Sequence, residues 1–163
     1  MIRPHTRDFR YGDDDLDVMA NDIVTARTLG VDGIVLGPLQ QDDTVHEQQL
    51  TQLAALARPM KVVFHRAFDR TCTSAESSLQ PLLDAGVDLV LTSGHAPTAL
   101  EGADTLRALY TQAADRLVVL AGGSVRAATV HPLLARTGVR EVHVRGTDPR
   151  VVRDVVHAVR NAG

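Results

Sequence analysis

The chain has 163 residues, of which 44% are hydrophobic and 23% charged, a composition typical of one globular domain with a hydrophobic core. Seventeen basic and twenty acidic residues give a net charge of −3, which argues against nucleic acid or an anionic membrane as the main partner. The single cysteine, Cys72, excludes an intrachain disulfide, and no apolar run is long enough to span a membrane. We therefore expect a cytoplasmic protein with a single domain over residues 1–163.

Short runs rich in valine and leucine recur along the chain, and each is followed by a stretch with the apolar spacing of a helix. A helix is also expected before the first run, at about Asp13 to Leu29. Strands that alternate with helices predict βα units and a parallel sheet. The five expected strands are residues 33–37, 61–65, 88–92, 117–121 and 141–144.

Residues 1–4 look like the end of a further strand, because a complete helix follows them. Together these elements make about six βα units, whereas a closed barrel of eight units needs roughly 200 residues or more. The repeat alone fits either an open doubly wound sheet or a barrel that lacks two units.

The faces of the expected strands favour the barrel. In the run from Lys61, Val62 and Phe64 share an apolar face, while Lys61 and His65 share the other face. A parallel strand covered by helices on both sides is apolar on both faces, whereas a barrel strand carries polar groups toward an open mouth. We therefore predict an α/β, TIM-barrel-like fold with outer helices.

The carboxyl ends of the expected strands supply the candidate site residues. His65 and His143 lie at the same end of two strands and, with Asp69, are the candidates for catalytic acid–base chemistry. Gly122 and Gly123 join a strand to a helix, where free N–H groups can cradle an anion. The full set of expected anion or ligand contacts is Arg3, Arg66, Thr92, Ser93, Gly122 and Gly123.

Each of these candidates also has a plainer interpretation. Arg66 and Asp69 can be a local ion pair that orders a loop, and Thr92 with Ser93 can form a short turn. Cys72 lies in the same loop as His65 and could reach toward it, but the residues alone give little support for a copper site.

Several motifs together resemble the copper homeostasis protein CutC family. The resemblance covers nearly the whole chain, and its most specific parts are FHRAFD at 64–69 and LTSG at 91–94. The motifs are, in chain order, residues 2–4 with Asp8, Phe9 and Tyr11, then residues 33–37, 64–69, 90–94, 121–126 and 140–143.

This resemblance implies a cytoplasmic TIM barrel associated with copper, and a copper ion would be expected at His65, Cys72 and His143. One alternative is a TIM-barrel enzyme that acts on a small anionic or phosphorylated metabolite, clamped by Arg3, Arg66 and the glycine loop. Another is an inactive, truncated remnant. A small molecule or a metal ion is the expected partner in the first two cases.

Members of that family usually begin with two further βα units, and this chain starts inside what would be their third strand. The family's Arg-Gly-Gly is also replaced here by residues 5–7, and the connection after the last strand is short. Without the two units, the strands at Ile2 and Val142 would both be edges with unpaired backbone groups. We therefore expect either self-association that covers these edges or a gapped barrel of low stability.

Overall fold

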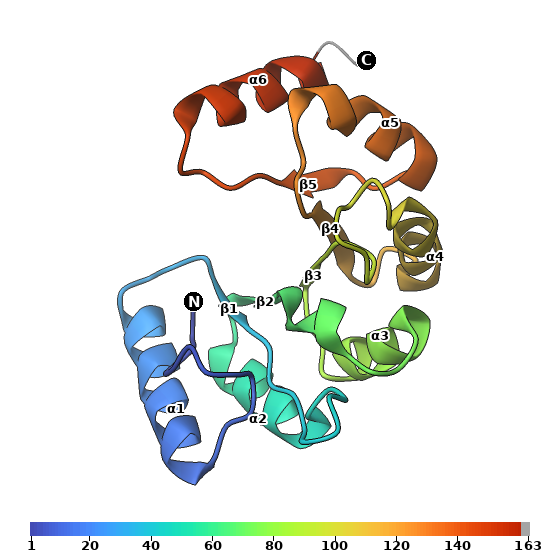
Figure 1. The fold of residues 1–163 in the computed structure, drawn as a ribbon. Helices are drawn as coiled ribbons and strands as arrows, with labels where there is room; N and C mark the ends of the chain where they lie inside the picture. Colours follow the sequence, from blue (N-terminus) through green and yellow to red (C-terminus); the bar gives the residue numbers. More distant parts are fainter. Residues whose placement is uncertain (161–163) are drawn as a thin grey trace.

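The structure, a computed structural model that describes residues 1–160, contains one parallel sheet of five strands in the order β1-β2-β3-β4-β5 (Figure 1). Each strand thus lies beside its neighbours in the sequence. A doubly wound sheet reverses its strand order at a switch point, so this sequential order identifies the barrel-like alternative. The strands are β1 (Gly33–Leu36), β2 (Lys61–Phe64), β3 (Leu89–Thr92), β4 (Val118–Gly122) and β5 (Glu141–His143).

The helices lie along the outer side of the curved sheet, and successive helices pack against each other from one end of the arc to the other (Figure 1). The arc stays open between its first and last helices. No helix among residues 1–160 has both the length and the apolar composition needed to cross a membrane. The helices are α1 (Asp13–Thr28), α2 (Glu47–Ala57), α3 (Ala75–Asp84), α4 (Ala103–Ala113), α5 (Ala127–Thr137), α6 (Pro149–Arg160) and the 3-10 helix η1 (Arg66–Arg70).

The predicted alternation of the strand faces is confirmed. In β2, Val62 and Phe64 are fully buried in the hydrophobic core, whereas Lys61 is exposed and Val63 is half-buried. The same alternation occurs in β1, β3 and β4. Burial of a valine or phenylalanine side chain contributes about 1.5–3 kcal/mol, so the core fixes which side chains face away from it.

The expected sixth strand at residues 1–4 is wrong. The N–H of Ile2 donates one hydrogen bond to the carbonyl of Val35 in β1, at 2.8 Å, and the Ile2 side chain is buried, but these residues form no strand. Pro4 has no N–H to continue such a ladder. The segment therefore covers the edge of β1 at one point only.

Candidate functional site

The loop after β2 begins with a turn that His65 fixes. Its Nδ1 accepts a hydrogen bond from the backbone N–H of Ala67, at 3.2 Å, and this bond starts the 3-10 helix η1. The ring packs against Phe9, with 4.9 Å between the ring centroids, and the residue is only 5% exposed. Burial lowers the pKa of His65 to about 4, and the positive charge of Arg3 acts in the same direction. His65 is therefore neutral at physiological pH.

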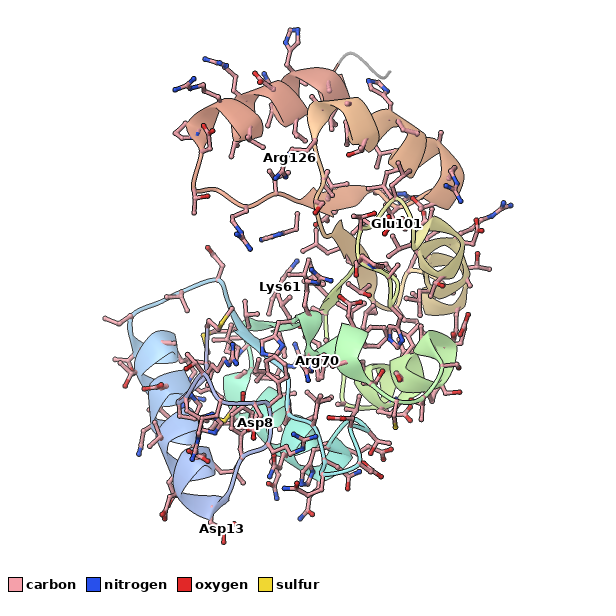
Figure 2. The ribbon with its side chains drawn as sticks, viewed as in Figure 1. Asp8, Asp13, Lys61, Arg70, Glu101 and Arg126 are labelled. Carbon is pink, nitrogen blue, oxygen red and sulfur yellow. The ribbon has the colours of Figure 1, made fainter. Side chains whose placement is uncertain are left out.

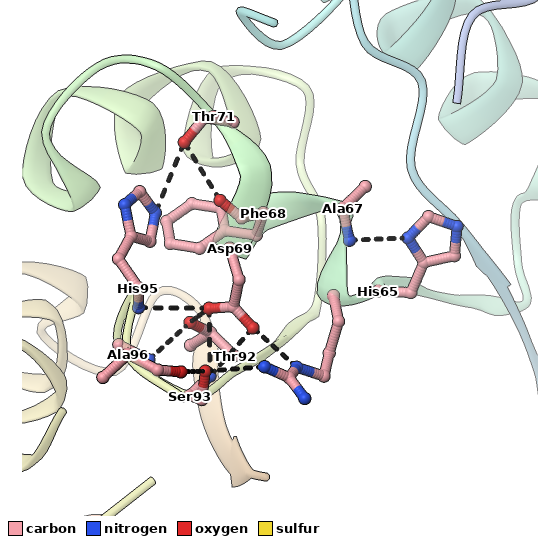
Figure 3. Close-up of polar contacts among 11 residues, drawn as sticks. His65, Ala67, Phe68, Asp69, Thr71, Thr92, Ser93, His95 and Ala96 are labelled. Atoms are coloured by element: carbon pink, nitrogen blue, oxygen red, sulfur yellow. Dashed lines mark hydrogen bonds and ion pairs between the residues drawn. The ribbon is translucent and has the colours of Figure 1, made fainter. Parts of the chain in front are cut away.

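Asp69 accepts hydrogen bonds from four residues at once (Figure 3). Arg66 Nε donates at 2.7 Å, Thr92 Oγ1 at 2.5 Å, the Ser93 N–H at 3.0 Å and the His95 N–H at 3.2 Å. The side chain is only 8% exposed, and these donors occupy its lone pairs. Asp69 therefore holds the ends of β2 and β3 together instead of offering a free base.

Arg66 is held by the same network. Its Nη2 donates to Ser93 Oγ at 2.7 Å, and that hydroxyl donates in turn to the carbonyl of Ala96 at 2.6 Å. A guanidinium fixed from two sides keeps its remaining N–H donors pointed in set directions. The predicted Arg66–Asp69 ion pair is present, and its effect is to orient Arg66.

A cavity of about 260 Å³ lies at the carboxyl ends of β3, β4 and β5. We call it the mouth cavity. Three of its lining residues are arginines and none is a carboxylate, so its electrostatic potential favours an anion. The lining residues are Arg66, Leu91, Gly123, Ser124, Val125, Arg126, His143 and Arg145.

The turn from β4 into α5 forms the back of the mouth cavity. Gly123 has φ +124°, and a Cβ there would lie 2.9 Å from the Cβ of Ser93, so only glycine fits. Ser124 also has a positive φ, of 54°. Within residues 1–160, the backbone N–H groups of Ser124 and Val125 donate no hydrogen bond. They lie just before α5, where the helix dipole adds partial positive charge.

Gly122 makes room for the side chain of Leu91, which also lines the mouth cavity. A Cβ on Gly122 would lie 3.3 Å from the Cβ and 3.7 Å from the Nδ1 of His143, and 2.5 Å from Leu91 Cδ1. The ring of His143 thus packs beside the backbone of β4 and lines the mouth cavity. Of the predicted catalytic residues, His143 alone reaches this cavity within the described part of the chain.

The structure divides the predicted anion-binding residues into four groups. Arg66 and Gly123 line the mouth cavity, whereas Gly122 acts through its lack of a side chain. Thr92 and Ser93 are fully buried. Thr92 donates a hydrogen bond to Asp69, and Ser93 accepts one from Arg66. Arg3 lies in a different pocket.

Arg126 is a site residue that the sequence analysis missed. It lies three residues after Gly123, at the end of the short link between β4 and α5. A Gly-Gly-Ser turn with an arginine just before the helix is the signal that points to it.

The predicted copper ligands do not come together. Among residues 1–160, no group of three or more His, Cys, Asp or Glu side chains is placed to hold a metal ion. His65 is buried against Phe9, and His143 lies in the mouth cavity. Cys72 is exposed, and its thiol donates to the carbonyl of Asp42 at 2.9 Å. The expected site of His65, Cys72 and His143 is therefore corrected to three separate positions.

Comparison with known proteins identifies relatives of this fold and sequence. Residues 1–147 match the CutC family. A CutC family protein of Vibrio campbellii is 41% identical over 152 residues, which are 92% of this chain and 61% of that protein. The mouse copper homeostasis protein cutC homolog is 39% identical over 150 residues, 92% of this chain and 55% of that protein.

A crystal structure of CutC from Streptococcus agalactiae superposes with a TM-score of 0.82 at 30% identity, and the match covers 88% of this chain and 70% of that one. The chain thus spans about three-fifths of the Vibrio relative and a somewhat larger share of the solved structure.

Proposed function

The chain belongs to the CutC family, and from this premise we propose that it serves copper homeostasis through a site that binds a small anionic molecule. The copper role comes from the name of the mouse relative. The anion is inferred from the residues that line the mouth cavity.

The observation that carries the proposal is the lining of the mouth cavity by Arg66, Arg126 and Arg145 with no carboxylate among its residues. Arginine presents planar, paired donors that match carboxylate and phosphate oxygens. Asp69 balances the charge of Arg66, but Arg126 and Arg145 have no carboxylate partner among the described residues, and an anion in the cavity relieves the repulsion between them. A phosphate or carboxylate group on a small metabolite is the ligand class that fits.

The lining residues contribute different interactions to such a ligand. Arg66, held by Asp69 and Ser93, provides fixed donors. Ser124 and Val125 also line the cavity, and their backbone N–H groups, which donate to no group among the described residues, add further donors. His143 is the one imidazole among the lining residues, so any acid–base step on the bound molecule would use it.

A resident copper ion does not fit this cavity. His143 is the only imidazole or thiol in the lining, whereas copper needs several nitrogen or sulfur ligands. The three arginines would also repel a cation. We therefore propose a role in copper homeostasis but assign no residue of this chain as a copper ligand.

Isothermal titration with inorganic phosphate and with small phosphorylated and dicarboxylate metabolites tests the anion site. We expect saturable binding that Arg145→Gln and Arg126→Gln each weaken about tenfold, because each removes a charged donor. Arg107→Gln on α4 is the matched control, since it removes the same charge from an exposed position outside the cavity. Absence of saturable binding, or equal weakening by the control, would contradict the proposal.

We also propose that the protein is cytoplasmic. The single cysteine is an exposed free thiol, which suits a reducing compartment. Alkylation of Cys72 in intact and in permeabilised cells tests this location, since a cytoplasmic thiol reacts with a membrane-impermeant reagent only after permeabilisation.

A further inference from the structure

A second, smaller pocket lies between the N-terminal segment, the loop after β1 and the end of η1. It encloses about 170 Å³. Figure 2 shows Asp8 and Arg70 in the lower half of the view, well apart from Arg126 in the upper part. We call it the Arg3 pocket. It is lined by Arg3, Thr6, Arg7, Asp8, Phe9, Arg10, Leu39, Asp43 and Arg70.

The charges in the Arg3 pocket do not cancel. Four arginines and two aspartates line it, and one of the arginines, Arg10, is already paired with Asp43 at 2.5 Å. Arg3, Arg7 and Arg70 have no carboxylate within 4.0 Å among the residues that the structure describes. Three unpaired guanidinium groups around one small space repel each other unless an anion joins them.

Arg3 carries a hydrogen-bond donor with no acceptor. Its guanidinium lies over the ring of Phe9, 4.6 Å from the centroid, and its Nη2 donates to the carbonyl of Thr6 at 3.2 Å. Its Nε, however, is buried without any partner in the described chain. Buried N–H groups are nearly always hydrogen-bonded in folded proteins, so this donor is unusual.

Two further buried donors near Arg3 also have no partner among the described residues: Tyr11 Oη and His65 Nε2. Burial raises the pKa of Tyr11, and the charge of Arg3 opposes this only in part, so the phenol stays protonated. In His65, Nδ1 accepts from Ala67, and the neutral ring therefore carries its hydrogen on Nε2. The two ring nitrogens of His5, which lies beside Tyr11, are likewise buried without a hydrogen-bond partner among the described residues, so this side of Arg3 holds both donors and acceptors.

We propose that the Arg3 pocket binds a second oxyanion the size of inorganic phosphate, whose oxygens accept from the guanidinium groups of Arg3, Arg7 and Arg70. The small volume and the net positive lining fit a compact acceptor with negative charge. The proposal is independent of the mouth cavity, because the two pockets share no lining residue.

A titration with inorganic phosphate followed by ¹H–¹⁵N correlation spectra tests the proposal at each pocket separately. The Nε–Hε signal of Arg3 reports on the Arg3 pocket, and the backbone amides of Gly123 and Ser124 report on the mouth cavity. We expect the Arg3 signal to move with a saturable midpoint. The double variant Arg7→Gln/Arg70→Gln weakens this midpoint about tenfold or more and leaves the Gly123 midpoint unchanged.

The control is Arg107→Gln/Arg116→Gln, which removes the same two charges from exposed positions on and just after α4. Sodium chloride at equal ionic strength gives the non-specific baseline. A glycerol phosphate titration shows whether the pocket takes a free oxyanion or the phosphate of a larger molecule. An Arg3 signal that does not move, that follows chloride equally, or that weakens as much in the control overturns the proposal. Loss of the Gly123 response alone overturns the mouth site instead.

Discussion

The two walls of the mouth cavity differ in how firmly their arginines are held. On the wall formed by η1 and β3, Arg66 is fixed by Asp69 and Ser93, whose side chains are themselves buried and hydrogen-bonded. On the wall formed by β4 and β5, the Arg126 side chain donates only to the carbonyl of Val125. Arg145 makes no hydrogen bond or ion pair within residues 1–160.

The difference follows from the position of each wall in the sheet. β3 pairs with strands on both sides, whereas β5 pairs with β4 alone and is largely exposed. Local opening of an edge strand breaks fewer hydrogen bonds than local opening of a strand inside the sheet, and it therefore costs less free energy. The cavity thus combines a rigid wall, which sets the geometry of a ligand, with an adaptable wall, which adds charge to it.

The largest expected effect comes from breaking the rigid wall. Asp69→Ala leaves the buried donors of Thr92 and the Ser93 N–H without an acceptor, and we expect a loss of about 3 kcal/mol in unfolding free energy. Urea unfolding measures it. Asp17→Ala, an exposed carboxylate on α1, is the control and should change stability by less than about 0.5 kcal/mol. Equal effects of the two substitutions would show that the network does not hold this wall.

A second prediction concerns how the free energy of unfolding changes with pH because of His65. The folded-state pKa of His65 is about 4 and its ordinary value is 6.5, so protons bind the unfolded chain more readily. The neutral, buried ring of His65 makes its full contribution to the unfolding free energy above pH 6.5, and this contribution is lost as the pH falls toward 4. Linkage gives a loss of about 2 kcal/mol from pH 7.5 to pH 5.

Urea unfolding at several pH values measures this slope. His65→Asn keeps an acceptor for the Ala67 N–H and should flatten the slope, whereas His157→Asn on the exposed side of α6 should not. A variant at His65 with the slope of the unsubstituted protein would show that the buried ring does not titrate as expected.

Sequence analysis reached the rigid parts of the molecule more easily than the site. The alternation of Val62 and Phe64 with Lys61 predicts the strand and its faces, because a strand with one buried face carries apolar residues at every second position. Carboxyl ends of parallel strands meet at one edge, and this placed Arg66, Gly123 and His143 correctly near one another.

The pairing of side chains across that edge leaves no such record. The sequence does not show that Asp69 is saturated by donors from β3 and its loop, or that Arg3 is in a pocket separate from Arg66. Both depend on which loop folds over which strand end. The same limit explains why Cys72, close to His65 in the sequence, is turned toward Asp42 instead.

The adaptable wall leads to the third prediction, which concerns self-association. A hollow of about 580 Å³ lies between β5 and α6, and Val156 on α6 is 43% exposed beside it. If a second copy covers this end, sedimentation equilibrium shows a dimer that Val156→Asp weakens about tenfold or more. Val24→Asp on α1, where the valine is 41% exposed, is the control and should leave the dimer intact. A protein that stays monomeric at all concentrations would refute self-association.

The smallest expected effect concerns copper. His65 packs against Phe9 outside the mouth cavity, whereas His143 lies on the adaptable wall of that cavity. Neither histidine shares a metal-binding group with Cys72 among the described residues. In Cu(I) competition against a chromophoric chelator at pH 7.5, His65→Ala and His143→Ala should each change the affinity less than about threefold. Cys72→Ser should remove most of any binding, because a thiolate is the donor that Cu(I) prefers and this thiol is exposed. Loss of Cu(I) affinity in either histidine variant would mean that the two walls close on a metal, and that the mouth cavity is not an anion site alone.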